Sequence, residues 1–205
     1  MQLSAAIAVR HRRTTLQTHI ARIAAEQSGL NQVNVTSLAV GPGREFFDVI
    51  EADEEHRLFI TGVDIDPGSL NFVAERAAGL GVSNQIRLLQ ANIIRMANGR
   101  QAVDMPTQHF VYCIGLMDYL RDEIVVSCLS WMFDNLQAGG EAMIGNFDTQ
   151  NPIKAYMDYI QEWVLIHRTP DDLRELFSRS KFGNRTVEVF SDTTNVQLFA
   201  LCIKS

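Results

Sequence analysis

The sequence has few cysteines and no long apolar run. Its three cysteines, Cys113, Cys128 and Cys202, are far apart and form no Cys-x-x-Cys pair, so neither a disulfide framework nor a zinc site is indicated. Such sparse cysteines favour a cytoplasmic location. No apolar stretch approaches the roughly 20 residues that span a bilayer, and the first residues lack a signal-peptide pattern. We therefore expect no membrane insertion and no bound metal.

Positive charge is also in short supply. The chain has 18 basic and 24 acidic side chains, which gives a net charge of -6. A surface with this balance repels the phosphate backbone, so we expect no nucleic-acid partner. One basic run, "RHRR" at 10–13, goes against the trend. It is either a solvated helix face or a contact for an anionic substrate or carrier.

Short β-branched runs alternate with longer helical segments, which is typical of an α/β domain. With 205 residues, 46% of them hydrophobic, the chain is expected to form a single domain. The predicted strands are 35–40, 57–63, 85–89, 108–114, 140–146, 186–190 and 196–203, and the predicted helices are 43–53, 67–79, 121–137 and 170–181. Only "SDTTN" separates the last two strands, so a mainly parallel sheet should end in an antiparallel hairpin.

Two further segments are predicted to be helical. Residues 1–30 should form an N-terminal helical cap before the first strand, and residues 31–205 the ligand-binding domain. A helical insertion is expected at 148–170, where apolar residues follow a helical spacing. Its stripe is either plain core or the cover of an apolar substrate pocket beside the sheet, built from Tyr156, Trp163 and neighbouring residues.

The stretch "VTSLAVGPGREFF" at 35–47 is a strand that ends in a glycine turn and leads into a helix. Such a turn presents backbone N–H groups and a positive helix end to a ligand, and Gly41 and Gly43 allow close approach. A dinucleotide site needs a third glycine where this chain has Phe46, which disfavours NAD. Asp64 follows the turn by about 20 residues, where a carboxylate accepts both hydroxyls of a ribose.

The motifs "LAVGPGRE", "GVDIDPGSLNFV", "LLQANI", "FVYCIGLMDYL" and "LQAGGEAMIGNF" resemble, in order, those of class I S-adenosylmethionine-dependent methyltransferases over residues 35–205. The resemblance implies a Rossmann-like sheet of seven strands, the last antiparallel, with helices on both faces, and S-adenosylmethionine as the cofactor. It also implies a set of cofactor contacts. These are Ala39, Gly41 and Gly43 at the methionine part, Asp64 at the ribose, Ile65, Asn92 and Ile93 at the adenine, and Cys113 to Gly115 at the sulfonium.

The chain departs from the family pattern at several motif positions. Ser37 stands where the family commonly has an acid, Ala39 where it has the first glycine, Asn92 where it has Asp, and His109 where an Asp often begins the fourth strand. The loss of the acid at 37 raises the question of what meets the methionine ammonium. Glu45 is nearest in sequence, and it is either that substitute or a solvated glutamate favoured by the helix dipole.

A narrower resemblance lies in "GLMDYL", "IGNF", "WVLIHRT" and the leader "AVRHRRTTLQTHI". They are similar to bacterial methyltransferases of extracellular-factor biosynthesis, whose product is a hydroxy fatty-acid methyl ester. This resemblance implies methyl transfer to the carboxyl oxygen of an apolar small-molecule substrate. A carboxylate is ionised at pH 7 and needs no base, whereas a hydroxyl or an amine would gain from one.

Candidate catalytic and substrate-binding residues follow the fourth and fifth strands or lie in the insertion. For a carboxylate we expect Arg168 or Asn146 to hold it and Tyr119 to line the transfer site; for a hydroxyl or an amine, Asp118 or His167 becomes the base. The predicted catalytic set is Asp118, Tyr119 and Asn146, and the predicted substrate contacts are Tyr119, Asn146, Tyr156, Trp163 and Arg168. Structural alternatives are a helix cap for Asp118, a surface position for His167, a helix-end contact for Arg168 and plain core for Trp163.

Other functions fit the same pattern. These are N- or O-methylation of a natural product, transfer of an aminopropyl-type arm from the same cofactor, and a non-catalytic S-adenosylmethionine-binding module. A nicotinamide oxidoreductase is disfavoured by Phe46. The sequence leaves open whether the chain acts alone, as a homodimer or with a larger polypeptide.

Overall fold

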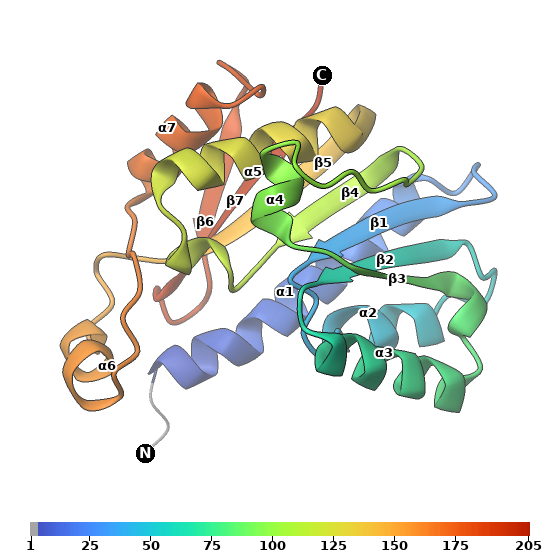
Figure 1. Cartoon of the computed structure of the whole chain (residues 1–205), viewed down its shortest axis with the longest axis horizontal. Coiled ribbons are helices and arrows are strands. Elements are labelled where there is room, and N and C mark those ends of the chain that lie inside the picture. The colour runs from blue at the N-terminus through green and yellow to red at the C-terminus, as the bar shows by residue number, and fades with distance from the viewer. Residues whose placement is uncertain (1–3) are drawn as a thin grey trace.

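A computed structural model describes residues 4–205, and its centre is one sheet of seven strands in the order β3-β2-β1-β4-β5-β7-β6 (Figure 1). The strands are β1 (Val33–Leu38), β2 (Leu58–Asp64), β3 (Ile86–Gln90), β4 (Gln108–Cys113), β5 (Leu136–Phe147), β6 (Val187–Ser191) and β7 (Gln197–Ile203). β1 to β5 pair in parallel, and β7 is antiparallel to both β5 and β6. The predicted Rossmann-like sheet and its closing hairpin are confirmed.

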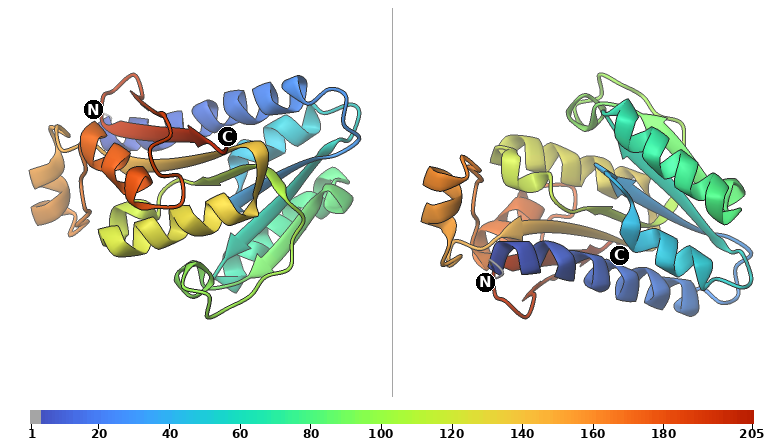
Figure 2. Two further views of the ribbon diagram at one scale, coloured as in Figure 1. Left: turned by 90° about the horizontal axis from the view of Figure 1, so that it is seen from above. Right: turned by 90° about the horizontal axis from the view of Figure 1, so that it is seen from below.

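Helices cover both faces of the sheet, as Figure 2 shows. The helices are α1 (Ser4–Glu26), α2 (Arg44–Glu51), α3 (Pro67–Leu80), α4 (Ile93–Ala97), α5 (Asp122–Asn135), α6 (Lys154–Ile160) and α7 (Pro170–Arg179). Side chains of α1, α2 and α3 share one buried cluster with the sheet, and those of α4, α5 and α7 share another. Both faces of the central strands are therefore buried, which explains their nearly continuous apolar sequences.

The N-terminal helix is an integral part of one helical layer. Leu16, Ile20 and Ile23 follow the spacing of one helical face and are buried against the sheet and α2. On another side of α1, Glu141 of β5 forms ion pairs with His19 and Arg22. These contacts help to hold the helix against the sheet.

Element boundaries differ from the predictions where turns are involved. β1 ends at Leu38 rather than at residue 40, because Ala39 already has a left-handed backbone with φ of 56°. The helix α4 was not expected, and the insertion 148–170 contains only one short helix, α6, followed by irregular chain. Within residues 4–205, no helix is both long and apolar enough to cross a membrane.

Candidate functional site

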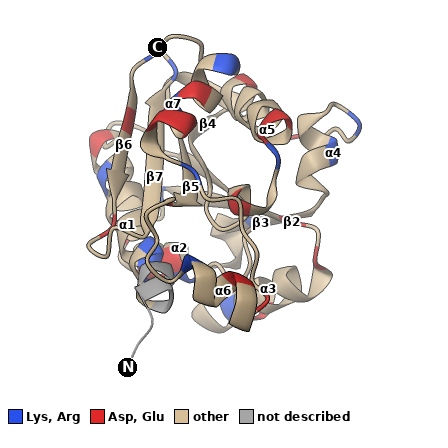
Figure 3. Ribbon diagram, turned by 90° about the vertical axis from the view of Figure 1, so that its left-hand side faces the viewer, with Lys and Arg blue, Asp and Glu red and all other residues tan. Residues whose placement is uncertain are grey.

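A cavity of about 470 Å³ opens beside the glycine turn that follows β1. Its lining combines the turn, the ends of β1 and β4, the start of α2 and the basic run of α1: Arg10, Arg12, Arg13, Leu16, Ser37, Ala39, Val40, Gly41, Pro42, Arg44, Glu45, Tyr112 and Ile114. Neither Tyr156 nor Trp163 lines it, so the predicted apolar pocket is not this cavity. Figure 3 shows basic positions of α1 gathered beside α2.

The glycine turn gives this cavity its floor. Ala39, Gly41 and Gly43 all have left-handed backbones, with φ of 56°, 51° and 55°. A Cβ atom on Gly41 would meet nothing within 4 Å, whereas one on Gly43 would lie 2.3 Å from the ring of Phe46. Phe46 thus packs under the turn where a dinucleotide site has its third glycine, and Gly41 leaves the space above the turn open.

Asp64 ends β2 beside this turn. Its Oδ2 accepts a hydrogen bond from Gly41 N at 3.0 Å, and its Oδ1 accepts one from Asp66 N at 3.0 Å. The carboxylate is therefore held in one orientation by two backbone donors. Ile65, the next residue, is 59% exposed, so its side chain is free to contact a flat ligand. Their predicted ribose and adenine contacts stay predictions.

The predicted cofactor contacts that follow the third and fourth strands are less accessible to a ligand. Asn92 caps α4, its Oδ1 accepting from Arg95 N at 3.1 Å, and Ile93 is buried. Cys113 is fully buried at the end of β4, where burial raises the pKa of its thiol. Gly115 has φ of 99° and lies against the guanidinium of Arg12.

Glu45 lies in the first turn of α2 and reaches the cavity beside Ser37. The hydroxyl of Tyr112 donates to its Oε1 at 2.8 Å. Burial raises the pKa of Glu45, because the charged form loses water, while the bond from Tyr112 opposes the shift. The arrangement fits the prediction that Glu45 replaces the family's acid at position 37. Tyr112 was not predicted as a site residue, although its position in a buried strand could have indicated it.

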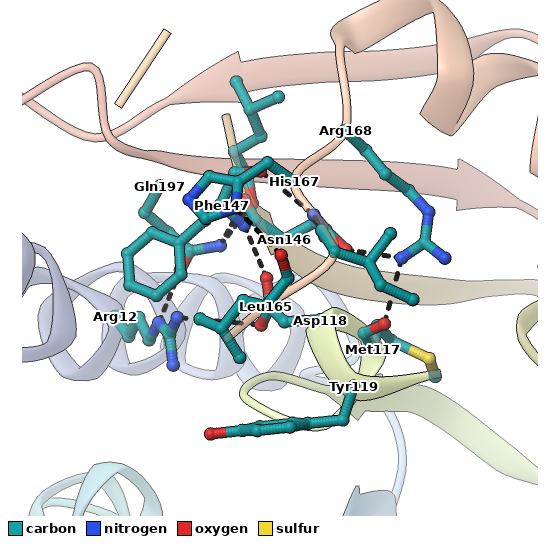
Figure 4. Close-up of polar contacts among 12 residues, drawn as sticks. Arg12, Met117, Asp118, Tyr119, Asn146, Phe147, Leu165, His167, Arg168 and Gln197 are labelled. Carbon is teal, nitrogen blue, oxygen red and sulfur yellow. Dashed lines mark hydrogen bonds and ion pairs between the residues drawn. The ribbon is translucent and has the colours of Figure 1, made fainter. Parts of the chain in front are cut away.

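Arg12 is a further residue of the site that the sequence named only within a basic run. Its Nε donates to Gln197 Oε1 at 2.5 Å, and its guanidinium lies 4.9 Å from the centre of the Phe147 ring (Figure 4). The nearest carboxylate, Asp118, is 3.9 Å from Nη2. Burial lowers the pKa of Arg12, and the Asp118 charge opposes this shift.

Arg168 and Asn146 form a closed structural network. The guanidinium of Arg168 donates to Asp122 Oδ1, Met117 O, Leu120 O and Asn146 Oδ1, so all five of its N–H groups are used. The amide of Asn146 donates to two backbone carbonyls, and its side chain is fully buried. Neither residue has a group left for a substrate, which corrects the expectation that one of them holds a carboxylate.

Asp118 and His167, the two predicted bases, also form hydrogen bonds within the protein. Asp118 is 1% exposed, and its Oδ1 accepts from Phe147 N at 2.6 Å. Burial raises the pKa of Asp118, while Arg12 lowers it. The ring of His167 contacts Asn151 Nδ2 and the carbonyl oxygen of Leu165 at 3.2 and 3.1 Å. These contacts favour positioning roles over proton transfer.

Of the aromatic candidates, Tyr156 and Trp163 lie in the insertion and Tyr119 lies after β4; none of them lines the cavity. Trp163 Nε1 donates to the hydroxyl of Tyr119 at 2.7 Å, and Tyr119 is 53% exposed. The Trp163 ring meets Phe147 edge-on, with centroids 5.8 Å apart. Tyr156 on α6 is 42% exposed. The structure thus brings Tyr119 and Trp163 together with Phe147 and leaves Tyr156 outside this contact.

No family profile and no curated protein matches this sequence. Solved structures do match. A possible exported protein from Bordetella parapertussis is similar over 99% of this chain and 70% of its own, with a TM-score of 0.78 and 18% identity. Magnesium protoporphyrin IX methyltransferase (ChlM) from Synechocystis, with bound S-adenosylhomocysteine, is similar over 95% of this chain and 83% of its own, with a TM-score of 0.69 and 12% identity. The N-methyltransferase NodS from Bradyrhizobium japonicum is similar over 95% of this chain and 95% of its own, with a TM-score of 0.61 and 15% identity.

The chain has the class I methyltransferase fold. It spans 50% of the length of PhzM, a pyocyanin biosynthetic protein, and of SibL, an S-adenosylmethionine-dependent methyltransferase. Structures of this fold include ChlM with bound S-adenosylmethionine.

The residues present fit this cofactor. Gly41, with open space above it, and Glu45 line the cavity, and the oriented carboxylate of Asp64 is hydrogen-bonded to Gly41. They match in kind what a nucleoside and an amino group require, since carboxylates accept from hydroxyls and pair with ammonium groups.

Proposed function

We propose that this chain is an S-adenosylmethionine-dependent methyltransferase that methylates the carboxyl group of an apolar small molecule. The observation that carries the proposal is the hydrogen bond from Gly41 N to Asp64 Oδ2 at 3.0 Å. It joins the glycine turn and the acid into one preformed unit beside the cavity. The likeness in fold to ChlM and NodS supports the same cofactor.

The bound cofactor supplies a methyl group on a positively charged sulfur, and its transfer to a carboxylate forms an O–C bond while the C–S electron pair stays on sulfur. No proton moves, so this acceptor needs no base. The protein has to align the acceptor, and positioning of two reactants contributes roughly 7–11 kcal/mol. In this proposal Asp64 holds the ribose, Glu45 holds the amino group, and Tyr119 lines the transfer site.

The engagement of Asp118 and His167 supports a carboxylate acceptor over a hydroxyl or an amine. A general base must reach the proton that it takes, within about 3 Å. Asp118 is buried under the chain that follows β5, and His167 is bonded to Asn151 and Leu165. An acceptor that is already ionised avoids this requirement.

The experiment is a product analysis with purified protein, S-adenosylmethionine and a series of straight-chain acids from octanoate to hexadecanoate. We expect a methyl ester and S-adenosylhomocysteine in equal amounts, and neither with Asp64→Ala. Methylthioadenosine in place of S-adenosylhomocysteine would instead show transfer of the cofactor's other arm. Methylation of the matching alcohols or amines but not of the acids would refute the carboxyl assignment.

A further inference from the structure

Arg12 has more hydrogen-bonding capacity than the protein satisfies. Its side chain is only 13% exposed, yet Nη2 is buried without a hydrogen-bond partner among the described residues. Asp118 is 3.9 Å from that nitrogen, close enough to balance charge but too far for a hydrogen bond. A buried donor on a charged group is costly to leave without a hydrogen-bond partner. The guanidinium therefore has a donor that is not used.

The protein holds this guanidinium in place. Gln197 accepts from its Nε, and the same amide donates to Asn146 O and Leu198 O at 2.9 and 2.6 Å. Gln197 is fully buried, so it is a rigid support. The Phe147 ring lies against the guanidinium, as Figure 4 shows. These contacts keep the guanidinium of Arg12 in the cavity lining, beside Gly115, although burying its charge is costly.

A carboxylate is the acceptor that suits these donors. The planar fork of a guanidinium matches two carboxylate oxygens, and such paired bonds are about twice as strong as neutral ones. Asp118 does not fill this position, because its Oδ1 accepts from Phe147 N and its Oδ2 stays 3.9 Å from Nη2. A neutral acceptor would bring no negative charge to a site that holds Arg12 and, once the cofactor is bound, its sulfonium.

A row of apolar side chains leads away from Arg12, from the fully buried Phe147 to a surface formed by Trp163 and Tyr119. Phe147 contacts both the guanidinium and the edge of Trp163, and Trp163 is bonded to Tyr119. Tyr119 is half exposed, so this surface reaches solvent. Aromatic side chains in such a row offer apolar area to a hydrocarbon chain.

We propose that Arg12 binds the carboxylate of the substrate, with the apolar body of the substrate along Trp163 and Tyr119. This inference rests on the proposed methyltransferase function and names the group that selects its substrate. The cofactor's own carboxylate has another guanidinium available, because Arg44 follows the glycine turn directly and lines the same cavity. Methylation converts the bound anion into a neutral ester, which loses the ion pair and leaves more readily.

The test is calorimetric titration in two steps on the wild type, on Arg12→Gln and on a control, Arg22→Gln. Arg22 is an ion-paired arginine of the same helix that does not line the cavity. S-adenosylhomocysteine is titrated first, and dodecanoate or dodecanamide is then titrated into the saturated protein. We expect Arg12→Gln to bind S-adenosylhomocysteine as the wild type does and to bind dodecanoate about 10- to 100-fold more weakly. Arg22→Gln should match the wild type in both steps.

Two results would overturn the assignment. One is loss of S-adenosylhomocysteine affinity in Arg12→Gln with unchanged affinity for methylthioadenosine, because this would place the cofactor's carboxylate on Arg12. The other is wild-type protein that binds S-adenosylhomocysteine but takes dodecanamide as tightly as dodecanoate. That second comparison needs no variant, so it decides the matter even if Arg12→Gln fails to fold. Failure of the wild type to bind S-adenosylhomocysteine would instead refute the proposed function itself.

Discussion

Glu45 is the carboxylate best placed to meet the amino group of the proposed cofactor. Burial raises its pKa, so it takes up a proton at a higher pH than an ordinary glutamate, whose pKa is about 4.3. A protonated Glu45 cannot pair with an ammonium group. We therefore expect the affinity for S-adenosylhomocysteine to fall as the pH is lowered through the raised pKa of Glu45, above the ordinary glutamate range.

Methylthioadenosine, which lacks the amino-acid part, should show no such fall, and titration calorimetry at a series of pH values compares the two ligands. Glu45→Gln should bind S-adenosylhomocysteine about tenfold more weakly and without this pH dependence. The control is Glu51→Gln, at the exposed end of the same helix. Equal pH profiles for both ligands would contradict the role of Glu45.

A second prediction at the scale of single residues concerns Gly41. Gly41→Ala puts a methyl group on a left-handed residue, with φ of 51°, and into the open space above the turn. The strain should lower the free energy of unfolding by about 1–2 kcal/mol, and the methyl group should weaken binding of S-adenosylhomocysteine. Gly79→Ala, in the last turn of α3 with nothing within 4 Å of the added carbon, should instead raise stability by up to about 0.5–1 kcal/mol. Urea unfolding of both variants checks the opposite signs, and a loss of stability in both would show that strain at Gly41 is not the cause.

The sequence located the glycine turn and Asp64 because their roles depend on local geometry and short spacing. It misassigned Arg168, whose five hydrogen bonds go to four residues in two distant segments, 117–122 and the end of β5, that no local pattern connects. It left Arg12 within a basic run for a related reason. Which arginine of a helix is buried depends on how the helix is rotated against the sheet, and this is set by distant contacts such as Gln197.

At the scale of elements, local signals predicted helix ends well and strand ends less well. Thr169 caps α7, its Oγ1 accepting from Asp172 N at 3.1 Å, and Pro170 is the first helical residue, as predicted. The ends of β1 and the short helix α4 were missed. Asn92 caps α4, and capping patterns on so short a helix are hard to tell from turns.

The docking of α1 gives a prediction at this scale. Burial by itself would raise the pKa of Glu141, but contacts with His19 and Arg22 outweigh it and the pKa is lowered. A carboxylate with a lowered pKa stabilises the fold above its unfolded pKa of about 4.3, and this contribution is lost as the pH falls through the folded value. Glu141→Gln should therefore cost about 1 kcal/mol at pH 7, with the difference shrinking below about pH 4.

Urea unfolding at several pH values measures this difference. Glu26→Gln is the control, because Glu26 is an exposed partner of the same Arg22. It should change the free energy of unfolding by less than about 0.5 kcal/mol. If both variants lost the same stability at neutral pH, the buried ion pairs of Glu141 would not be what holds α1.

At the scale of the whole molecule, the sheet brings distant segments to one edge. The glycine turn after β1, Asp64 at the end of β2 and Gly115 after β4 meet because β2, β1 and β4 are neighbours in the sheet. The chain order of motifs predicted this edge, since ligands of open α/β sheets bind where parallel strands end. The approach of α1 to the same edge was not predictable from strand order, and it adds the basic side of the cavity.

The measurement that tests the central claim most directly is calorimetric titration of the protein with S-adenosylmethionine, S-adenosylhomocysteine and NAD, repeated on Asp64→Ala. We predict micromolar dissociation constants for the first two ligands, no binding of NAD because Phe46 occupies the place of the third glycine, and loss of binding in the variant. Binding of NAD, or no binding of S-adenosylmethionine and S-adenosylhomocysteine by the wild type, would contradict the claim that this cavity is a methyltransferase cofactor site.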